Sequence, residues 1–350
     1  MNTEASIEEA PTVKFAELTD AALQALDERS RDIIVRRFGL GKDEKETLES
    51  IGKEYGITRE RVRQIEANAK KELTLMRDLF TSIENLLTNV FKDHGGLMAE
   101  AHAVEVVNNQ TNANVSPHTL HFYLTIIPHF SSNQPNALFE THWKHEESLH
   151  DQIEAIVLAA MEILKEKNAP ISLPELIEQI SKRLNGNVSD SHIRAALKAS
   201  KHVSPTAFGD WGLIGWAETS PRGVGDKAFA VLRRNGKPAH FRDITTMIND
   251  ASFDQKKANP QTVHNELIKD GRFVLVGRGL YGLKEWGYMA GTVADVLESI
   301  LAKATKPMSK QELVEEVLKQ RMVKKNTILL SLQNTSRFDK VGKDLYAIHK

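Results

Sequence analysis

Four polar side chains between Arg59 and Gln64 have the types and the spacing that base reading in DNA requires. If residues 58–71 (TRERVRQIEANAKK) form a helix, Arg59 and Arg63 make one stripe, and Glu60 and Gln64 make the neighbouring one. Arginine can donate two hydrogen bonds to guanine, glutamate can accept one from the cytosine amino group, and glutamine can pair with adenine. These four residues are therefore candidate base-reading side chains.

The sequence also indicates the cap, the turn and the preceding helix that would hold this helix in place. Thr58 is a good N-cap, because its hydroxyl can accept a hydrogen bond from a first-turn amide. Gly56 can adopt the left-handed conformation of a tight turn at little cost. Two short helices joined by such a turn are typical of a helix-turn-helix that binds the DNA major groove. Each predicted helix has an apolar face: Leu48, Ile51 and Tyr55 in the first, and Val62, Ile65, Ala69 and Leu73 in the second.

Other basic residues of this module are candidates for contacts with DNA phosphates. Arg61 lies off the base-facing stripes, and Lys53, Arg36 and Arg37 come earlier in the chain. The alternative is an amphipathic helix whose charges simply face water, and composition alone favours that alternative. The set expected to face DNA is Thr58, Arg59, Glu60, Arg61, Arg63, Gln64, Lys53, Arg36, Arg37 and Lys71.

Four stretches carry a resemblance: residues 26–31 (LDERSR), 37–40 (RFGL), 47–52 (TLESIG) and 56–66 (GITRERVRQIE). Together they closely resemble region 4 of the sigma-70 family of bacterial RNA polymerase sigma factors, over residues 20–77. In that family the module binds the promoter −35 element and packs on the polymerase flap. The resemblance implies that Arg59, Glu60, Arg63 and Gln64 read bases, and that Arg61 and Lys53 contact the DNA backbone. It places the helix of Arg36 and Arg37 near the flap or a phosphate.

The chain behind this module contains an internal repeat. Four leucines recur at intervals of roughly 70 residues, the size of a small domain: Leu124, Leu197, Leu267 and Leu332. Aligning on them also aligns Leu120, Ile193, Val263 and Ile328, and then His129, His202, Arg272 and Arg337. Each repeat has the pattern of three helices followed by a hairpin, clearest over residues 273–283. We therefore predict four winged-helix units.

The third of these units, around Phe241–Trp286, carries the segment GRFVLVGRGLYGLKEW. It resembles the HARE-HTH family, which includes the N-terminal domain of the RNA polymerase delta subunit. The resemblance implies an interaction with nucleic acid or with polymerase, without saying which.

The predicted fold is mainly α, with a sigma-like helix-turn-helix and four tandem winged helices that have small β-hairpin wings. Apolar residues continue at helical spacing from Leu73 to Val90 without glycine or proline. We therefore expect the reading helix, or a helix directly continuous with it, to enter the first winged helix without a flexible linker. The predicted divisions are a disordered tail (1–18), the helix-turn-helix (19–77), and winged-helix units at 78–147, 148–218, 219–289 and 290–350.

Local charge ranks the winged-helix units as DNA candidates. Between Lys303 and Lys350, 11 residues are Lys or Arg and 5 are Asp or Glu. Arg278 and Lys343 stand at the predicted wing tips of units three and four, where a basic side chain can touch a phosphate. The alternative for either residue is a solvated turn. Units one and two have no basic tip, which fits spacers or protein-binding surfaces.

Composition excludes several classes of function. The chain has 350 residues, a net charge of −1 and no cysteine, so disulfides, cysteine zinc sites and thiol catalysis are excluded. No apolar run is long enough for a membrane span, and the acidic N-terminus is unlike a secretory signal, so we expect a cytoplasmic protein without a membrane partner. Histidine is a common metal ligand and the chain has thirteen, but no third ligand accompanies His118 and His121 at a convincing spacing. We expect no cofactor, no metal, no small-molecule substrate and no enzyme activity.

These features predict a DNA-binding bacterial transcription factor that reads a −35-like promoter sequence and contacts RNA polymerase. The regions with which sigma factors grip the polymerase and melt the promoter are not recognisable, so we do not expect a complete sigma factor. One alternative is an accessory subunit of RNA polymerase that occupies the flap without sequence-specific DNA reading. Another is a targeting subunit of a DNA-processing or restriction system.

Overall fold

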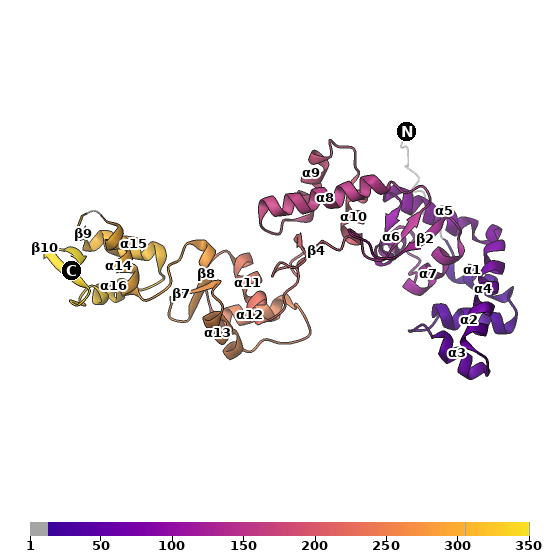
Figure 1. Ribbon diagram of the computed structural model, residues 1–350, viewed down its shortest axis with the longest axis horizontal. Helices are drawn as coiled ribbons and strands as arrows, with labels where there is room; N and C mark the ends of the chain where they lie inside the picture. Colours follow the sequence, from indigo (N-terminus) through magenta and orange to yellow (C-terminus); the bar gives the residue numbers. More distant parts are fainter. Residues whose placement is uncertain (1–12, 305, 350) are drawn as a thin grey trace, which may run out of the picture. The chain divides into compact units, whose positions relative to one another are not determined.

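The computed structural model describes residues 13–304 and 306–349. Its elements fall into two compact units, one ending at Ser204 and the other beginning at Pro205 (Figure 1). Helices predominate and the sheets are small and antiparallel, which confirms the predicted fold class. The division between the units falls inside the range 148–218 that the sequence predicted as one domain; the other predicted boundaries stay predictions.

The helix-turn-helix begins earlier than the sequence predicted. Val13 is buried and Phe15 starts a helix with only 4% of its surface exposed, so the predicted disordered tail is wrong for residues 13–18. This part of the chain is ordered because Phe15 contacts Tyr123, which is distant in sequence, and no local pattern reveals this contact. Residues 1–12 of that predicted tail lie outside the described residues. The four helices of the module are α1 (Phe15–Gln24), α2 (Glu28–Phe38), α3 (Leu48–Tyr55) and α4 (Arg59–Leu75).

Side-chain caps start three of these helices. The Asp27 carboxylate accepts from the amides of Arg29 and Ser30, and the Thr47 hydroxyl accepts from the amide of Ser50. Gly56 follows α3 with φ of 64°, a left-handed conformation that glycine adopts without strain. The predicted cap of the reading helix is confirmed, since the Thr58 hydroxyl accepts from the Arg61 amide at 3.2 Å.

The first winged helix and the three helices of the second complete the N-terminal compact unit. In the first, strands β1, β3 and β2 lie in that order in one antiparallel sheet. The wing loop of the first winged helix packs on the second winged helix, where Glu140 N donates to Ala199 O at 2.9 Å and Lys201 N donates to Leu138 O at 3.0 Å. The elements are α5 (Arg77–Asp93), β1 (Leu97–Met98), α6 (Glu100–Thr111), α7 (Pro117–Ile126), β2 (Phe130–Asn133) and β3 (His142–His145), then α8 (His150–Lys167), α9 (Leu173–Arg183), α10 (Asp190–Ala199) and β4 (Val203–Pro205).

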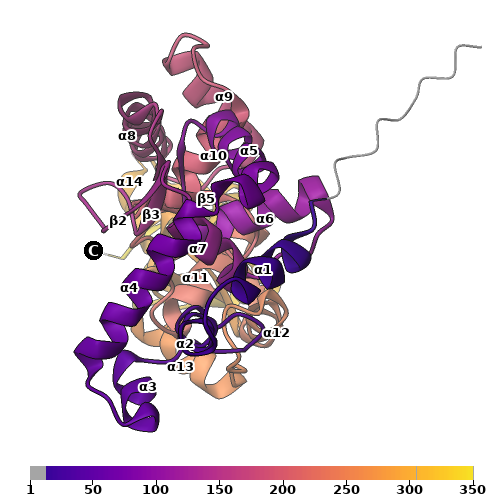
Figure 2. The same ribbon diagram turned by 90° about the vertical axis from the view of Figure 1, so that its right-hand side faces the viewer.

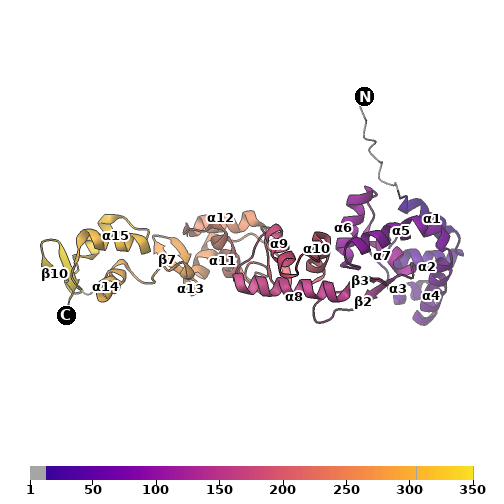
Figure 3. The ribbon, with the colours of Figure 1, turned by 90° about the horizontal axis from the view of Figure 1, so that it is seen from above.

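Two further winged helices make up most of the C-terminal compact unit (Figure 3). Their sheets have the orders β6-β8-β7 and β10-β11-β9, so the two units repeat one topology. The unit opens with β5 (Trp211–Leu213). The third winged helix comprises α11 (Val224–Asn235), β6 (Ala239–His240), α12 (Phe241–Ala251), α13 (Pro260–Lys269), β7 (Phe273–Gly277), β8 (Leu280–Leu283) and a 3-10 turn at Lys284–Trp286. The fourth comprises α14 (Val293–Lys303), β9 (Met308–Ser309), α15 (Lys310–Gln320), α16 (Lys325–Ser331), β10 (Phe338–Gly342) and β11 (Leu345–Ile348).

The helix-turn-helix and the first winged helix share one apolar core. The rings of Phe38 in α2 and Phe122 in α7 meet edge to face, with their centroids 5.3 Å apart. The hydroxyls of Thr19 and Tyr123 lie 2.8 Å apart in the same interior. A second, smaller core of Ile33, Ile51 and Val62 holds the turn between α3 and α4. The first winged helix is therefore packed directly on the helix-turn-helix.

The second of the two expected arrangements is confirmed: a separate helix follows the reading helix directly and leads into the first winged helix without a flexible linker. Helices α4 and α5 are separate, but only Met76 lies between them, and its amide still donates to Leu73 O at 3.0 Å. The buried residues Leu73 and Phe80, on either side of this break, both belong to the shared core.

The shared core generates a stability prediction for Phe122→Ala, because Phe122 is fully buried between α2 and its own unit. We expect it to lower the free energy of unfolding by about 3–5 kcal/mol. In hydrogen exchange, amides of α2 and α5 should lose protection together. Leu75→Ala is the matched control, because Leu75 is 78% exposed and its loss should change little. Protection of α2 that survives in the Phe122 variant would contradict a shared core.

Candidate nucleic-acid interface

The turn between α3 and α4 borders a surface groove of about 710 Å³. Gly52 allows the two helices to approach closely, since a Cβ atom there would lie 2.8 Å from the Ile57 carbonyl oxygen. From this turn α4 runs toward α7 (Figure 2). The groove is lined by Glu49, Gly52, Lys53, Gly56, Ile57, Thr58, Arg59 and Arg61. It therefore brings the predicted phosphate candidates Lys53 and Arg61 together with the start of the reading helix.

The first two turns of α4 expose the predicted base-reading side chains. Arg59, Glu60, Arg63 and Gln64 are all at least partly exposed, as are the groove residues Thr58, Lys53 and Arg61. This half of α4 thus presents donors and acceptors to solvent, while Val62 faces the small core. The structure places them together as the helical spacing predicted; that they bind DNA stays a prediction.

Two of these side chains are paired with each other in the free protein. The Arg63 guanidinium donates to both carboxylate oxygens of Glu60, at 2.6 and 2.8 Å, and both side chains are more than half exposed. This hydrogen bond lowers the pKa of the Glu60 carboxyl and raises the pKa of Arg63. Arg61 donates in turn to the Gln64 side-chain oxygen at 3.1 Å. Before these groups can meet bases, DNA must replace their mutual hydrogen bonds.

Arg36 was predicted to contact a phosphate or to lie near the flap, and the structure contradicts an exposed role. Only 7% of its surface is exposed. Its guanidinium donates to Glu46 at 2.6 and 3.0 Å and also to Glu54 in α3. These hydrogen bonds raise the pKa of Arg36 above its ordinary value. Arg36 therefore ties α2 to α3 and to the segment between them.

Arg37 is also engaged inside the module, although 27% of its side chain remains exposed, and its predicted phosphate contact stays a prediction. Its Nε donates to the Glu66 carboxylate of α4 at 3.0 Å, and its Nη1 donates to the backbone oxygen of Glu46 at 2.5 Å. Glu66 is itself buried and also pairs with Lys70 at 2.6 Å. Arg37 thus fixes α2 against α4.

Lys71 is exposed but lies away from the base-reading residues. Eleven residues separate it from Glu60, which puts it on the same side of the helix about 16 Å further along the axis. A contact from Lys71 would therefore reach the DNA backbone beyond the bases that Glu60 faces.

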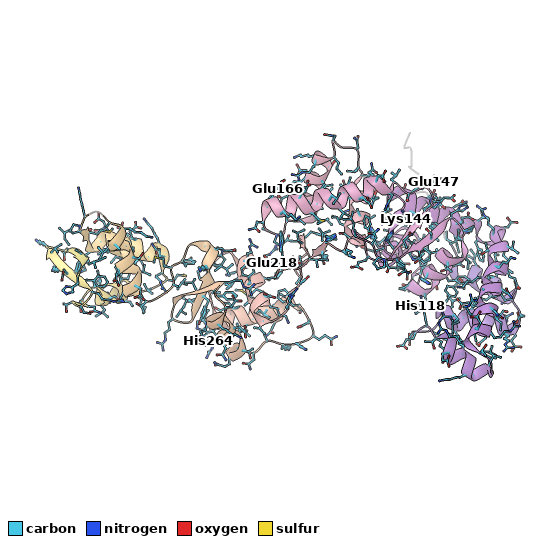
Figure 4. All side chains as sticks on the ribbon, in the orientation of Figure 1. His118, Lys144, Glu147, Glu166, Glu218 and His264 are labelled. Carbon is cyan, nitrogen blue, oxygen red and sulfur yellow. The ribbon has the colours of Figure 1, made fainter. Side chains whose placement is uncertain are left out.

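Other parts of the module make contacts within the chain. Lys70 lies over the Phe38 ring, 5.5 Å from its centroid, and Thr74 donates to Ile126 O at 3.1 Å. Nδ1 of His118, labelled in Figure 4, lies 3.1 Å from the Gly39 carbonyl oxygen. The polar surface from Lys53 to Gln64 is what this packing leaves for a partner.

The wing-tip residues and third helices differ between the units. Arg278 and Lys343 are both exposed at their hairpin tips, as predicted. Helix α13 of the third unit exposes Gln261, Asn265 and Lys269. The equivalent helices α7 and α10 are largely buried, with Leu120, Phe122, Tyr123, Leu124, Ile126, Ile193, Ala195, Ala196 and Leu197 all below a tenth exposed. This contrast favours units three and four as further DNA contacts.

The histidines serve packing and local hydrogen bonds. His142 is buried and its Nδ1 lies 2.8 Å from Glu140 O, while His121 lies 2.6 Å from the Glu100 carboxylate. Burial lowers the pKa of His102 to about 4. Within residues 13–304 and 306–349, no group of three or more potential metal-binding side chains comes together. In the same part of the chain, every helix is too short or too polar to span a bilayer.

Two segments of the chain match models of known families. Residues 22–74 match the family model of sigma-70, region 4, which confirms the first resemblance. Residues 224–286 match the HARE-HTH model, a helix-turn-helix domain whose description includes restriction endonucleases, which confirms the second. The first match contains the whole α3–α4 surface described above.

Curated relatives match the same short region. RNA polymerase sigma factor RpoS of Coxiella burnetii is 55% identical over 51 residues, which cover 15% of this chain and 14% of the relative. RNA polymerase sigma factor RpoD of Helicobacter pylori is 54% identical over 55 residues, 15% of this chain and 8% of the relative. RNA polymerase principal sigma factor HrdD of Streptomyces viridifaciens is 44% identical over 68 residues, 19% and 20% respectively. The chain thus spans a fifth or less of these relatives, and the matches support a DNA-binding role related to transcription.

The Arg36 cluster generates a stability prediction. Arg36→Ala should lower the free energy of unfolding by about 2–3 kcal/mol, less than for a fully buried pair because Glu46 and Glu54 stay partly exposed. Arg61→Ala, at an exposed position, should change stability little. Chemical denaturation of both variants provides the measurement.

The same cluster predicts a pH dependence. The Arg36 guanidinium holds the pKa of the Glu46 carboxyl below its usual 4.5. A depressed carboxyl pKa contributes stability above the unfolded-state pKa, and that contribution is lost as the pH falls through the folded-state value. The stability gap between the wild type and Arg36→Ala should therefore narrow below about pH 4.5. A gap that stays constant down to about pH 3 would contradict the assigned ion pair.

The Glu60–Arg63 pair generates a binding prediction for Glu60→Ala. The change removes a negative charge from the exposed face and frees Arg63, so affinity for an arbitrary duplex should rise. Discrimination at the base pair that Glu60 reads should fall by about 1–3 kcal/mol. Fluorescence anisotropy with a selected and a scrambled duplex at one salt concentration measures both effects. Glu72→Ala, an exposed glutamate further along α4, should leave discrimination intact.

Proposed function

We propose that this chain is a bacterial transcription factor that acts in the cytoplasm and reads a −35-like promoter sequence through α4. The observation that carries the proposal is the exposure of Arg59, Glu60, Arg63 and Gln64 on a helix whose opposite face is packed. Their hydrogen-bonding groups match the base edges of the major groove. The family match over residues 22–74 and the sigma-factor relatives support the same assignment.

In this proposal, basic side chains outside the base-reading set contact DNA phosphates. Lys53 and Arg61 line the groove beside the base-reading residues and are suited to phosphate contacts there. The exposed Arg278 and Lys343 would add contacts to phosphates elsewhere on the same DNA. The proposed mechanism is binding and positioning, without catalysis, with RNA polymerase as the protein partner.

The alternative is a polymerase accessory subunit in which the module binds the flap and reads no DNA. A protein-binding role would draw on apolar surface, because apolar contact supplies most association energy. In this chain Phe38 and Leu73 are already buried in the core shared with α5 and α7. The remaining face is charged and hydrogen-bonding, which supports the DNA-reading proposal over this alternative.

Selection of bound sequences from a random duplex library with the full chain tests the proposed function. We expect an enriched −35-like site whose preference changes in Arg59→Ala. Lys343→Ala should weaken binding to all sequences about equally, because a phosphate contact carries no base information. Anisotropy titrations over a salt series should show a shallower salt dependence for the Lys343 variant.

Two outcomes would go against the proposal. If Arg59→Ala leaves the selected site fully discriminated, the base-reading assignment is wrong. If the chain binds purified core RNA polymerase in the absence of DNA and shifts no duplex at low salt, the accessory-subunit alternative replaces it.

A further inference from the structure

The third and fourth winged helices contain equivalent edge strands. β7 (Phe273–Gly277) and β10 (Phe338–Gly342) each lie at the edge of a three-stranded sheet. Both pair antiparallel with the next strand of their hairpin, and both have a register shift before a terminal glycine, at Gly277 and Gly342. Val276 and Val341 therefore occupy the same place in the repeat.

In the third unit this edge is covered by an extended segment of the fourth. Met322 N donates to the Val276 carbonyl oxygen at 2.9 Å. The Arg321 guanidinium donates to the carbonyl oxygens of Leu275 and Gly291. As a result Val276 is fully buried and Arg321 is only 4% exposed. An arginine followed by an apolar residue is thus the sequence that this edge binds within the chain.

The covering segment explains the glycine of the third unit. A Cβ atom at Gly277 would lie 2.7 Å from the Met322 carbonyl oxygen, too close for any side chain. The backbone at Gly277 is not left-handed, so conformational freedom does not require glycine there. The requirement is the close approach of a second backbone.

The fourth unit keeps the same glycine, but no segment within residues 13–304 and 306–349 covers it as Met322 covers Gly277. A Cβ atom at Gly342 would contact only Leu345, at 3.4 Å or more, and this backbone is not left-handed either. Val341 is 54% exposed, against full burial for Val276. In the described part of the chain, no other segment donates a hydrogen bond to the Val341 carbonyl oxygen. The docking geometry is thus present and the edge is open.

We propose that the β10 edge binds an extended segment of a partner protein in which an arginine precedes an apolar residue. The partner's apolar residue would donate its backbone N–H to Val341 O, and the arginine would donate to Lys340 O. Gly342 leaves room for the partner's backbone, and the apolar side chain covers Val341. One main-chain hydrogen bond and one arginine contact would thus hold the segment at the edge, as they hold the Arg321–Met322 segment at β7.

A second copy of this chain is a poor occupant of the edge. Its own Arg321–Met322 segment is held against β7. Direct pairing of two β10 edges would bring the exposed Lys340 and Lys343 of both copies together, and edge lysines oppose such self-association. The occupant is therefore a segment of another protein.

The probe for the test is a synthetic peptide with the sequence of residues 318–325 (LKQRMVKK), carrying a photoreactive group at the position of Met322. With the full-length chain we expect cross-links to residues 338–345. Gly342→Val should reduce the yield at least tenfold, because its side chain fills the space of the incoming backbone. A peptide with alanine at the arginine position should lose a similar factor.

Controls separate docking from misfolding and from charge. Gly342→Val should keep the wild-type melting temperature and duplex affinity, because its Cβ meets no backbone atom. Lys343→Ala and a scrambled peptide of the same charge report non-specific attraction, and only the scrambled peptide should lose binding. Cross-links that map to residues 273–280, or equal yields for wild type and a folded Gly342→Val, would overturn the proposal.

Discussion

The packing of the helix-turn-helix on the first winged helix is the contact on which the rest of the N-terminal unit depends. Phe38 meets Phe122 edge to face, and Thr19 and Tyr123 share a buried hydroxyl contact. This core uses the apolar side of α2 and of the second half of α4. The first half of α4 stays exposed, so one apolar contact both anchors this helix and decides which of its faces a partner can reach.

The module sorts similar charged residues into two roles. Arg36 and Arg37 are enclosed by glutamates and hold α2 against α3, α4 and the segment between them. Arg63 forms its ion pair in solvent, where such a pair contributes little to stability and exchanges readily with a ligand. The enclosed pairs therefore give the module its shape, and the exposed pair is free to be replaced by bases.

Much of this organisation could be predicted from local patterns. Helical spacing located the face of Arg59 to Gln64, the cap at Thr58 was readable from residue type, and the repeat indicated the winged helices. The failures concern contacts between residues distant in sequence. Arg36 is of a residue type that commonly binds phosphates, and only the fold brings Glu54 to it. Phe15 lies in an apparently polar tail until its contact with Tyr123 is known. The cover on Val276 likewise comes from the following unit, 46 residues away.

The central claim is that the first half of α4 lies in the DNA major groove and touches base edges. Photo-cross-linking of the full chain to a selected duplex, with a photoreactive base placed in turn at each position of the site, tests this claim most directly. The most efficient cross-links should fall on residues 59–64, from base positions whose substitution weakens binding. Cross-links confined to residues 205–350, or efficient cross-links from flanking positions alone, would contradict it.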